Sequence, residues 1–434
     1  MTDTVVLSRT AGIAQSDDAV VKKVMKRLLP FLILCFFVNT LDRVNVSFAS
    51  LTMNKDLGFT AEIFGFGAGI FFLGYFLFEV PSNMVMHKVG ARVWIFRIML
   101  TWGIVTVATA FIHNATHFYV ARFLLGVAEA GFTPGIQLYL TYWIPRRHLG
   151  KAFAFFVIGV PLSTVFGAPI FGWLLTFDGT MGLEGWRWLF ILTGIPAILL
   201  SFGVLAYLTD RPEKAAWLTT DERDWLVREM ELERASVISK GSHSFGAAVK
   251  NPRTLMLAAT YFFLVVGLYG IGFWLPQIIK GFGVTNFQAS LLTAIPFAAA
   301  ALALVVWGRH SDKSKERRWH LTVSLGLAAV GFIATALSGS IFVSILAITI
   351  TAMGVYATLP IFWSIPPTFL TGAGAAGGIA LINSIGNLGG FAGPYLVGWI
   401  KGATGEFQYA LMGLAASIVL ALIIGNLASR SVRS

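Results

Sequence analysis

Twelve apolar segments, each long enough to cross a lipid bilayer, occupy most of this sequence. A membrane-spanning helix needs about 20 mostly apolar residues. Hydrophobic residues make up 56% of the 434 positions and charged residues only 12%, whereas a soluble chain has about 25% charged residues. The spans are predicted at residues 28–50, 62–86, 93–112, 117–143, 150–176, 186–208, 254–276, 286–307, 321–338, 341–363, 374–398 and 407–428. We therefore predict an all-α membrane protein with twelve transmembrane helices.

Lysine and arginine are unequally divided between the loops. If the N-terminus lies inside, the inner segments carry 26 of these residues and the outer loops carry four, while Arg43 and Arg122 lie within spans. Positively charged residues are enriched on the cytoplasmic side of membrane proteins. The pattern predicts that both termini are cytoplasmic. The net charge of +11 is spread over loops that flank apolar segments, which argues against nucleic acid as a partner.

A polar stretch at residues 209–253 divides the spans into two sets of six. Pro169 and Pro394 lie 225 residues apart, and so do the polar loops 83–92 and 308–317. This repeat predicts a duplicated six-helix unit, a design found in transporters with a site near the membrane midplane. The predicted parts are an N-terminal bundle that carries the charged residues and the proton coupling, a cytoplasmic linker with a short amphipathic helix, and a C-terminal bundle, at residues 1–208, 209–253 and 254–434.

Five ionisable residues lie inside predicted spans, all in the first third of the chain. A charge at the bilayer centre costs about 2.5–3.5 kcal/mol even on the lenient insertion scale, so such residues are functional candidates. They are Asp42, Arg43, Glu79, Arg122 and Glu129, whereas residues 321–400 contain no Asp, Glu, Lys or Arg. Arg122 and Glu129 are seven residues apart, close to two helical turns, so they share one face of a helix.

The two buried arginines are expected at similar depth. At ~1.5 Å per residue, Arg43 and Arg122 lie roughly 10 Å and 8 Å below the outer boundary. Two guanidinium groups can hold a carboxylate by paired donors. Burial disfavours the ionised form of a carboxyl group and a nearby arginine favours it, so Asp42 and Glu129 are predicted proton carriers. In this hypothesis, protonation of either acid weakens its pairing with an arginine, which then attracts the substrate anion.

Structural roles for the same residues remain open. Asp42–Arg43 and Arg122–Glu129 are alternative ion pairs that would only hold helices together. Glu79, which precedes Pro81 near the inner end of its span, is predicted to anchor the following loop or to meet Arg92.

Several motifs resemble those of a known transporter superfamily. The loops 83–92 and 308–317 are similar to the loop signature of the major facilitator superfamily, although Asn83, His87 and Lys315 depart from it. More specific matches are to the anion:cation symporter family within it, and they lie at residues 41–45 (LDRVN), 78–83 (FEVPSN), 126–132 (GVAEAGF) and 210–218 (DRPEKAAWL). The chain is similar to bacterial carriers for tartrate, phthalate and 4-hydroxyphenylacetate. This resemblance implies proton-coupled import of a small organic carboxylate across a bacterial inner membrane, driven by the proton gradient without a cofactor.

Uncharged side chains are predicted to supply specificity from the second half. Asn383 and Asn387 are four residues apart and therefore face one way. The resemblance implies that Trp363, Asn383 and Tyr75 line the cavity. The full set of predicted substrate-binding residues is Arg43, Arg122, Tyr75, Gln137, Tyr261, Tyr269, Trp363, Ser364, Asn383 and Asn387.

The loop charges are predicted to latch and gate the cytoplasmic face. These gating residues are Lys88, Arg92, Asp312 and Arg317. A metal site is not expected, because Cys35 is the single cysteine and the histidines lie in loops or at span ends. No nucleophile–base set or nucleotide-binding loop is present, so we predict a transporter and not an enzyme. The oligomeric state stays open from the sequence, and a monomer is expected.

Two other functions remain open from the sequence: an organic-anion exchanger, and a membrane sensor of the same acid. The substrate also stays open. Abundant aromatic residues favour an aromatic acid, whereas Thr133, Gln137, Asn383 and Asn387 favour a hydroxylated acid such as tartrate or a sugar acid.

Overall fold

The computed structural model describes residues 2–239, 250–370 and 372–429, and this part of the chain is helical without any strand. Its first portion contains α1 (Thr2–Asp56), α2 (Ala61–Val89), α3 (Ala91–Thr109), α4 (Ala115–Glu129), α5 (Phe132–Leu140), α6 (Arg146–Leu174), η1 (Leu175–Phe177), η2 (Thr180–Gly182) and α7 (Gly185–Tyr207). We refer to α1–α7 as the N-half.

The remaining helices follow a polar connection. It contains η3 (Pro212–Lys214) and α8 (Thr220–Ser239), while residues 240–249 of the predicted linker lie outside the described residues. Then come α10 (Pro252–Lys280), α11 (Asn286–Ser314), α12 (Arg318–Leu337), α13 (Ile341–Trp363), η4 (Pro366–Thr368), α14 (Gly372–Thr404) and α15 (Phe407–Ser429). We refer to α10–α15 as the C-half.

Local sequence sets where several of these helices begin. Thr285 caps α11 through a reciprocal arrangement in which its hydroxyl accepts from the Gln288 N–H and the Gln288 side chain accepts from the Thr285 N–H. Asn114 caps α4 by accepting from the His117 N–H at 2.9 Å. Such caps satisfy backbone donors that the first helical turn leaves free.

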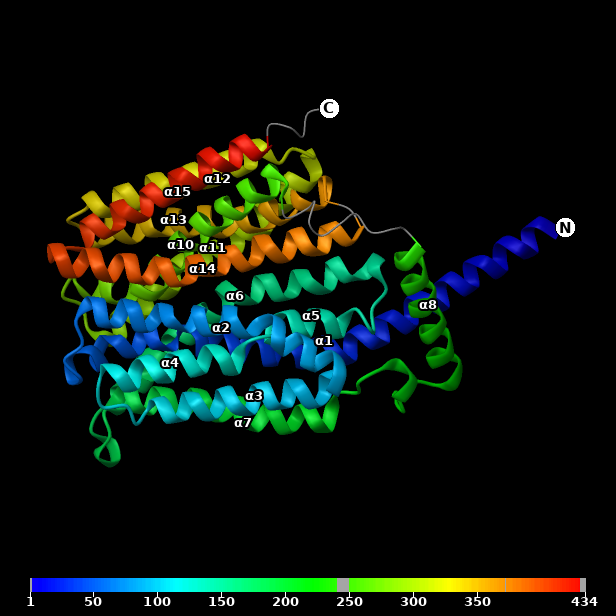
Figure 1. Cartoon of the computed structure of the whole chain (residues 1–434), viewed down its shortest axis with the longest axis horizontal. Coiled ribbons are helices and arrows are strands. Elements are labelled where there is room, and N and C mark those ends of the chain that lie inside the picture. Colours follow the sequence, from blue (N-terminus) through cyan, green and yellow to red (C-terminus); the bar gives the residue numbers. More distant parts are fainter. Residues whose placement is uncertain (1, 240–249, 371, 430–434) are drawn as a thin grey trace.

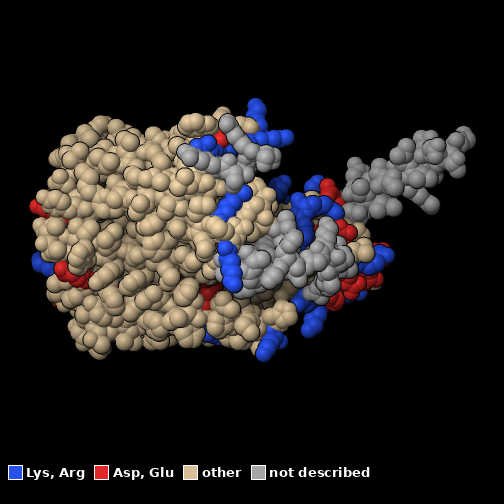
Figure 2. Space-filling model, turned by 45° about the horizontal axis from the view of Figure 1, so that its top comes forward, with Lys and Arg blue, Asp and Glu red and all other residues tan. Residues whose placement is uncertain are grey.

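Ten helices in the described part of the chain are long and apolar enough to cross a membrane. The other two predicted spans correspond to α14 and to the α4–α5 pair. The chain is thus an all-helical membrane protein with ten to twelve apolar helices. Figure 2 agrees with this assignment, because charged side chains gather near the two ends of the molecule and the surface between them is largely uncharged.

The span predicted over 117–143 is interrupted in the structure. The α4 helix ends at Glu129, and Gly131 adopts φ +85° before α5 begins. Only glycine enters that left-handed region without a steric penalty, and a Cβ on Gly131 would overlap the Ser82 hydroxyl of α2. The break therefore places the Glu129 carboxyl at a helix end inside the protein.

The two halves lie side by side, with the beginning of α1, the end of α15 and α8 at one end of the bundle (Figure 1). We call this the α8 end and the opposite one the far end. Between the halves, α2 packs on α14, α6 on α11, and α1 on α10. Toward the far end, glycines bring α2 and α14 close: a Cβ on Gly65 would lie 2.6 Å from the Pro394 carbonyl oxygen.

Candidate functional site

An ion pair between Arg43 of α1 and Glu129 of α4 forms the centre of the candidate site. The Arg43 Nε donates to Glu129 Oε1 at 2.9 Å, and its Nη2 contacts the same oxygen. The Glu129 side chain is fully buried, whereas 17% of the Arg43 side chain is exposed. Glu129 Oε2 is also buried and has no hydrogen-bond partner among the described residues. One carboxylate oxygen is therefore left without a donor.

Arg122 of α4 is a second buried cation beside this pair. Its guanidinium makes long contacts of 3.4 Å to the carbonyl oxygens of Gly67 and Ala68 in α2. Its Nη1 has no partner, and no carboxylate within the described residues lies within ion-pair distance of it. The guanidinium carbons of Arg43 and Arg122 lie 5.4 Å and 5.1 Å from the centre of the Phe71 ring. Both cations are thus gathered around one aromatic side chain.

Asp42 is fully buried, but it points toward α3 and α7 rather than toward Arg43. Its Oδ1 accepts from the Asn45 side chain at 2.8 Å, and its Oδ2 accepts from the Thr106 hydroxyl. Asn45 also contacts the Thr193 hydroxyl at 3.1 Å. The sequence contained no pattern that pointed to Thr106 or Thr193, because isolated threonines are common within apolar helices.

The two ion pairs considered from the sequence are therefore corrected. Neither Asp42–Arg43 nor Arg122–Glu129 is an ion pair in the described structure; the pair that forms is Arg43–Glu129. Successive residues of an α-helix are about 100° apart around its axis, so Asp42 and Arg43 face different neighbours. The break after Glu129 changes the direction of the chain there.

Aromatic side chains from both halves adjoin the ion pair. The Arg43 guanidinium lies 5.3 Å from the Tyr75 ring centre. The Tyr269 ring of α10 lies 4.4 Å, centre to centre, from the ring of Phe72, the neighbour of Phe71 in α2, with the two ring planes tilted by 56°. A cation over an aromatic face gains electrostatic attraction. The structure thus brings Tyr75 and Tyr269 to the region of Arg43, one from each half.

Glu79 is placed differently from its prediction. It is nearly buried, and its carboxylate accepts from the Asn383 side-chain amide of α14 at 3.4 Å and also contacts Asn387. Arg92 instead donates to the Leu205 carbonyl at 2.7 Å, while its backbone N–H donates to Asp210. The prediction that Glu79 meets Arg92 was wrong, because Arg92 at the start of α3 turns toward the end of α7.

Glu79 is therefore the residue of interest that sequence reasoning undervalued. Its contacts join α2 of the N-half to α14 of the C-half. The sequence did hold a signal for this contact. Buried polar groups need hydrogen-bond partners, and the chain contains one such acid and two amides that face the same way.

The other predicted binding residues occupy two places. Tyr261 of α10 packs against Trp363 of α13 with ring centres 5.0 Å apart, and both side chains are partly exposed. The Ser364 hydroxyl donates to the Ile361 carbonyl at 2.6 Å, so it serves its own helix end. Gln137 lies on α5 with an exposed side chain. Among the described interactions, none of these four residues forms a hydrogen bond or a cation–ring contact with Arg43 or Glu129.

The predicted gating residues contact their own halves. Asp312, near the end of α11, forms an ion pair at 2.7 Å with Arg317, the residue just before α12, and Arg92 is held by α7, as described above. Lys88 is exposed. Within the described residues, none of the four forms a hydrogen bond or ion pair that crosses between the halves.

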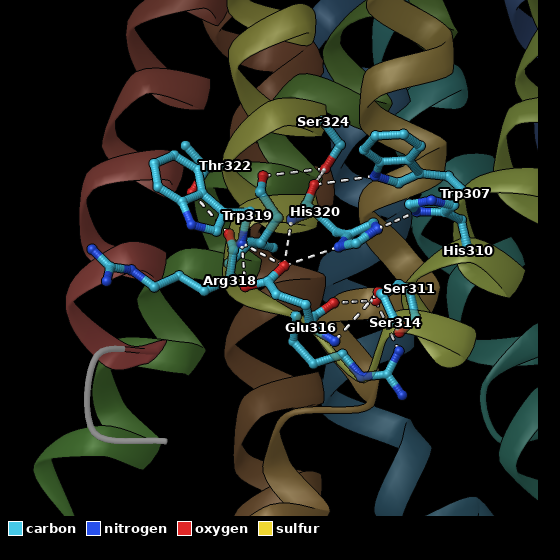
Figure 3. A network of polar contacts seen from close by, with 12 residues as sticks. Trp307, His310, Ser311, Ser314, Glu316, Arg318, Trp319, His320, Thr322 and Ser324 are labelled. Carbon is cyan, nitrogen blue, oxygen red and sulfur yellow. Dashed lines mark hydrogen bonds and ion pairs between the residues drawn. The ribbon is translucent and has the colours of Figure 1, made fainter. Parts of the chain in front are cut away.

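The end of α11, the start of α12 and the short loop between them carry a dense polar network (Figure 3). Glu316 accepts from the backbone N–H groups of Trp319 and His320 at the start of α12, and the two histidine rings of His310 and His320 lie 2.7 Å apart, nitrogen to nitrogen. An acid at a helix N-terminus is stabilised by the free N–H groups there. The network therefore fixes the loop in place. In the described part of the chain, no cluster of three or more metal-ligating side chains occurs.

Comparisons with known proteins agree with this architecture. The family model of the Major Facilitator Superfamily matches residues 32–394 and, in a second match, 257–431. A protein of Agrobacterium vitis that is named as a tartrate transporter is 51% identical over 96% of both chains. A protein of Acinetobacter baumannii named "Quinolone resistance transporter" is 40% identical over 94% of both chains.

A solved structure gives the same fold. A bacterial homologue of the human lysosomal transporter Spinster, in an inward-facing conformation, superposes with a TM-score of 0.77 over 93% of this chain and 96% of that chain, at 20% identity. The superfamily that the loop and span motifs predicted is confirmed by the family model. This chain belongs to the Major Facilitator Superfamily and is an integral membrane transporter, not an enzyme.

Proposed function

We propose that this transporter imports a small organic carboxylate together with protons by alternating access. The observation that carries the proposal is the arrangement of two buried guanidiniums around Phe71, of which only Arg43 has a carboxylate partner. A buried charge without a partner is costly. Arg122 therefore favours the entry of an anion, and its planar guanidinium suits a carboxylate.

We propose that Glu129 releases Arg43 when its carboxylate takes up a proton. Its Oε2 has no donor within the described structure, so a proton can be accepted there without breaking another contact. Once neutral, Glu129 holds Arg43 less strongly, and the freed guanidinium can bind the substrate. Substrate and proton then favour the same state, which is the thermodynamic requirement for symport. Asp42 is proposed as a second proton site, since it is buried in the same region.

The cycle also requires the two halves to rearrange around the substrate. Glu79 and the two amides of α14 lie where the N-half meets the C-half. We propose that this contact forms and breaks as the site changes access, with Tyr269 adding a surface from the C-half next to Arg43. Alternating access in such folds moves one bundle against the other around a fixed site.

The proposed substrate is a hydroxylated carboxylate such as tartrate. The name of the Agrobacterium vitis relative supports this choice. So do the amides of Asn383 and Asn387, because amides can donate to and accept from hydroxyl groups. The name of the Acinetobacter baumannii relative favours a second candidate function, the export of a quinolone.

Uptake by purified protein in liposomes tests the proposal. With an acidic outside and a neutral inside, radiolabelled tartrate should accumulate above its outer concentration, and a protonophore should abolish that accumulation. Phthalate, 4-hydroxyphenylacetate and a quinolone serve as competitors that rank the substrate classes. Equal tartrate accumulation with and without the pH gradient would contradict symport. Quinolone movement out of the liposomes without tartrate uptake would favour the second candidate function.

Glu79 offers a prediction with paired variants. Glu79→Gln keeps an oxygen that can accept from Asn383, so we expect its initial rate of tartrate uptake to stay within about threefold of wild type. Glu79→Leu leaves the amides without an acceptor, which costs about 1–3 kcal/mol, and uptake should fall roughly tenfold. If Gln is as harmful as Leu, the negative charge itself is needed and Glu79 would join the proposed proton carriers.

A further inference from the structure

A basic pocket lies at the α8 end of the N-half, away from the candidate substrate site. Its volume is about 650 Å³, and its wall consists of Ala19, Lys22, Lys23, Lys26, Arg27, Tyr207 and Trp217. We call it the α1–α7 pocket, since α1 supplies the cations and Tyr207 is the last residue of α7. Figure 1 shows α8 crossing α1 beside this end of the bundle.

Most of the positive charge in this pocket is not neutralised by the protein. Lys23 is paired with Glu222 of α8 at 2.6 Å, and this hydrogen bond lowers the pKa of the Glu222 carboxyl, which keeps it ionised. Asp18, the nearest acid along α1, pairs with His148. No carboxylate in the described part of the chain lies within 4 Å of the charged groups of Lys22, Lys26 or Arg27. Three cations therefore remain for an outside anion.

The arginine of the pocket is fixed in place by aromatic rings. The Arg27 guanidinium lies 4.7 Å from the Tyr207 ring centre and 4.9 Å from that of Trp217. The Tyr207 hydroxyl donates to the Arg27 carbonyl at 3.0 Å. Arg27 Nε and the Trp217 indole nitrogen are buried donors without a described acceptor. Buried donors rarely lack a partner, so this wall is short of a hydrogen-bond acceptor.

The pocket lies at the level where a membrane surface is expected. Arg27 immediately precedes the apolar part of α1, and Tyr207 ends the apolar part of α7. Tyrosine and tryptophan favour this interfacial depth. Further along the two helices, large apolar side chains are exposed: Leu34 at 46%, Leu199 at 65% and Phe202 at 55%. Leu34 comes seven residues, close to two helical turns, after Arg27 and therefore lies on the same face of α1, on the bilayer side of the pocket.

We propose that the α1–α7 pocket binds the phosphate headgroup of an anionic phospholipid, whose acyl chains lie against α1 and α7. Basic pockets at the cytoplasmic ends of transmembrane helices suit such headgroups. A free phosphate would use the same cations, but it would gain nothing from the exposed Leu34 on the Arg27 face of α1. The interfacial level of the pocket and the apolar side chain below its arginine are the reasons that we commit to a lipid.

Native mass spectrometry of the full chain in detergent tests the proposal. Phosphatidylglycerol should bind more tightly than phosphatidylcholine, and the triple variant K22Q/K26Q/R27Q should weaken phosphatidylglycerol binding by about tenfold or more. The matched control R309Q/K313Q/K315Q removes three exposed cations at the end of α11 and should bind like wild type. The double variant K22Q/K26Q keeps Arg27 and its contacts with the aromatic rings, and it takes the place of the triple variant if that variant does not fold.

Two outcomes would overturn the proposal. The first is equal phosphatidylglycerol binding by wild type and by both pocket variants. The second is displacement of the lipid by inorganic phosphate or glycerol phosphate at concentrations near that of the lipid, which would assign the pocket to a soluble anion. Neither result bears on substrate transport, so the proposed function can fail while this site stands.

Discussion

Replacement of Arg43 by Gln should lower proton-driven tartrate uptake by about a hundredfold or more. The change removes a guanidinium that is proposed to hold the substrate carboxylate, and it also leaves the buried Glu129 without its cation. Breaking a buried ion pair costs about 3–5 kcal/mol, and each 1.4 kcal/mol corresponds to about tenfold. The measurement is the initial rate of uptake into liposomes under an imposed pH gradient.

Two further variants separate charge from geometry. Arg43→Lys keeps the charge but loses the planar fork that contacts a carboxylate at two points, so its uptake should fall between wild type and Arg43→Gln. Arg97→Gln changes an arginine of α3 that lies over Trp94, outside the candidate site, and should transport at a rate near that of wild type. Near-normal uptake by Arg43→Gln would remove Arg43 from substrate binding.

Replacement of Glu129 by Gln should abolish accumulation driven by the pH gradient and preserve exchange of internal for external substrate. Glutamine mimics the protonated acid, so Arg43 stays free to bind the anion while the proton can no longer be released. Gradient-driven accumulation should fall to the equilibrium level, and counterflow should stay within about threefold of wild type, a change of less than 1.4 kcal/mol.

Asp42→Asn provides the comparison for the second proposed proton site. Both Asp42 oxygens already accept hydrogen bonds from Asn45 and Thr106, so this variant tests whether a fully satisfied acid also carries a proton. Loss of accumulation with retained counterflow would assign it to coupling. Loss of both activities would instead indicate a structural role.

Accumulation by Glu129→Gln equal to wild type would exclude Glu129 from coupling.

The helical architecture was predictable because the bilayer imposes it. Apolar segments of sufficient length mark the spans without any knowledge of packing. The break between α4 and α5 could not be predicted, because Gly131 and Pro134 in an apolar segment are compatible with either a kinked helix or an interrupted one. The tight approach of Gly131 to Ser82 of α2 decides between them, and that contact is tertiary.

The candidate site was predictable as a set of residues but not as a set of contacts. An isolated acid or arginine in an apolar helix stands out from the sequence alone, as Arg43 and Glu129 do. Its partner depends on how helices rotate against one another, which explains why Arg43 pairs with Glu129 and not with its neighbour Asp42. Glu79 shows the same limit, because its partners Asn383 and Asn387 lie more than 300 residues away in the chain.

The central claim is that a proton on Glu129 frees Arg43 for the anion. The pH dependence of substrate binding tests this claim most directly. Tartrate affinity of the purified chain would be measured by titration calorimetry at a series of pH values, for wild type and Glu129→Gln. The account predicts that wild-type affinity weakens as pH rises, because ionised Glu129 competes for Arg43, and that the variant shows a clearly shallower dependence. Wild-type affinity that is independent of pH, or an equally steep dependence in Glu129→Gln, would contradict it.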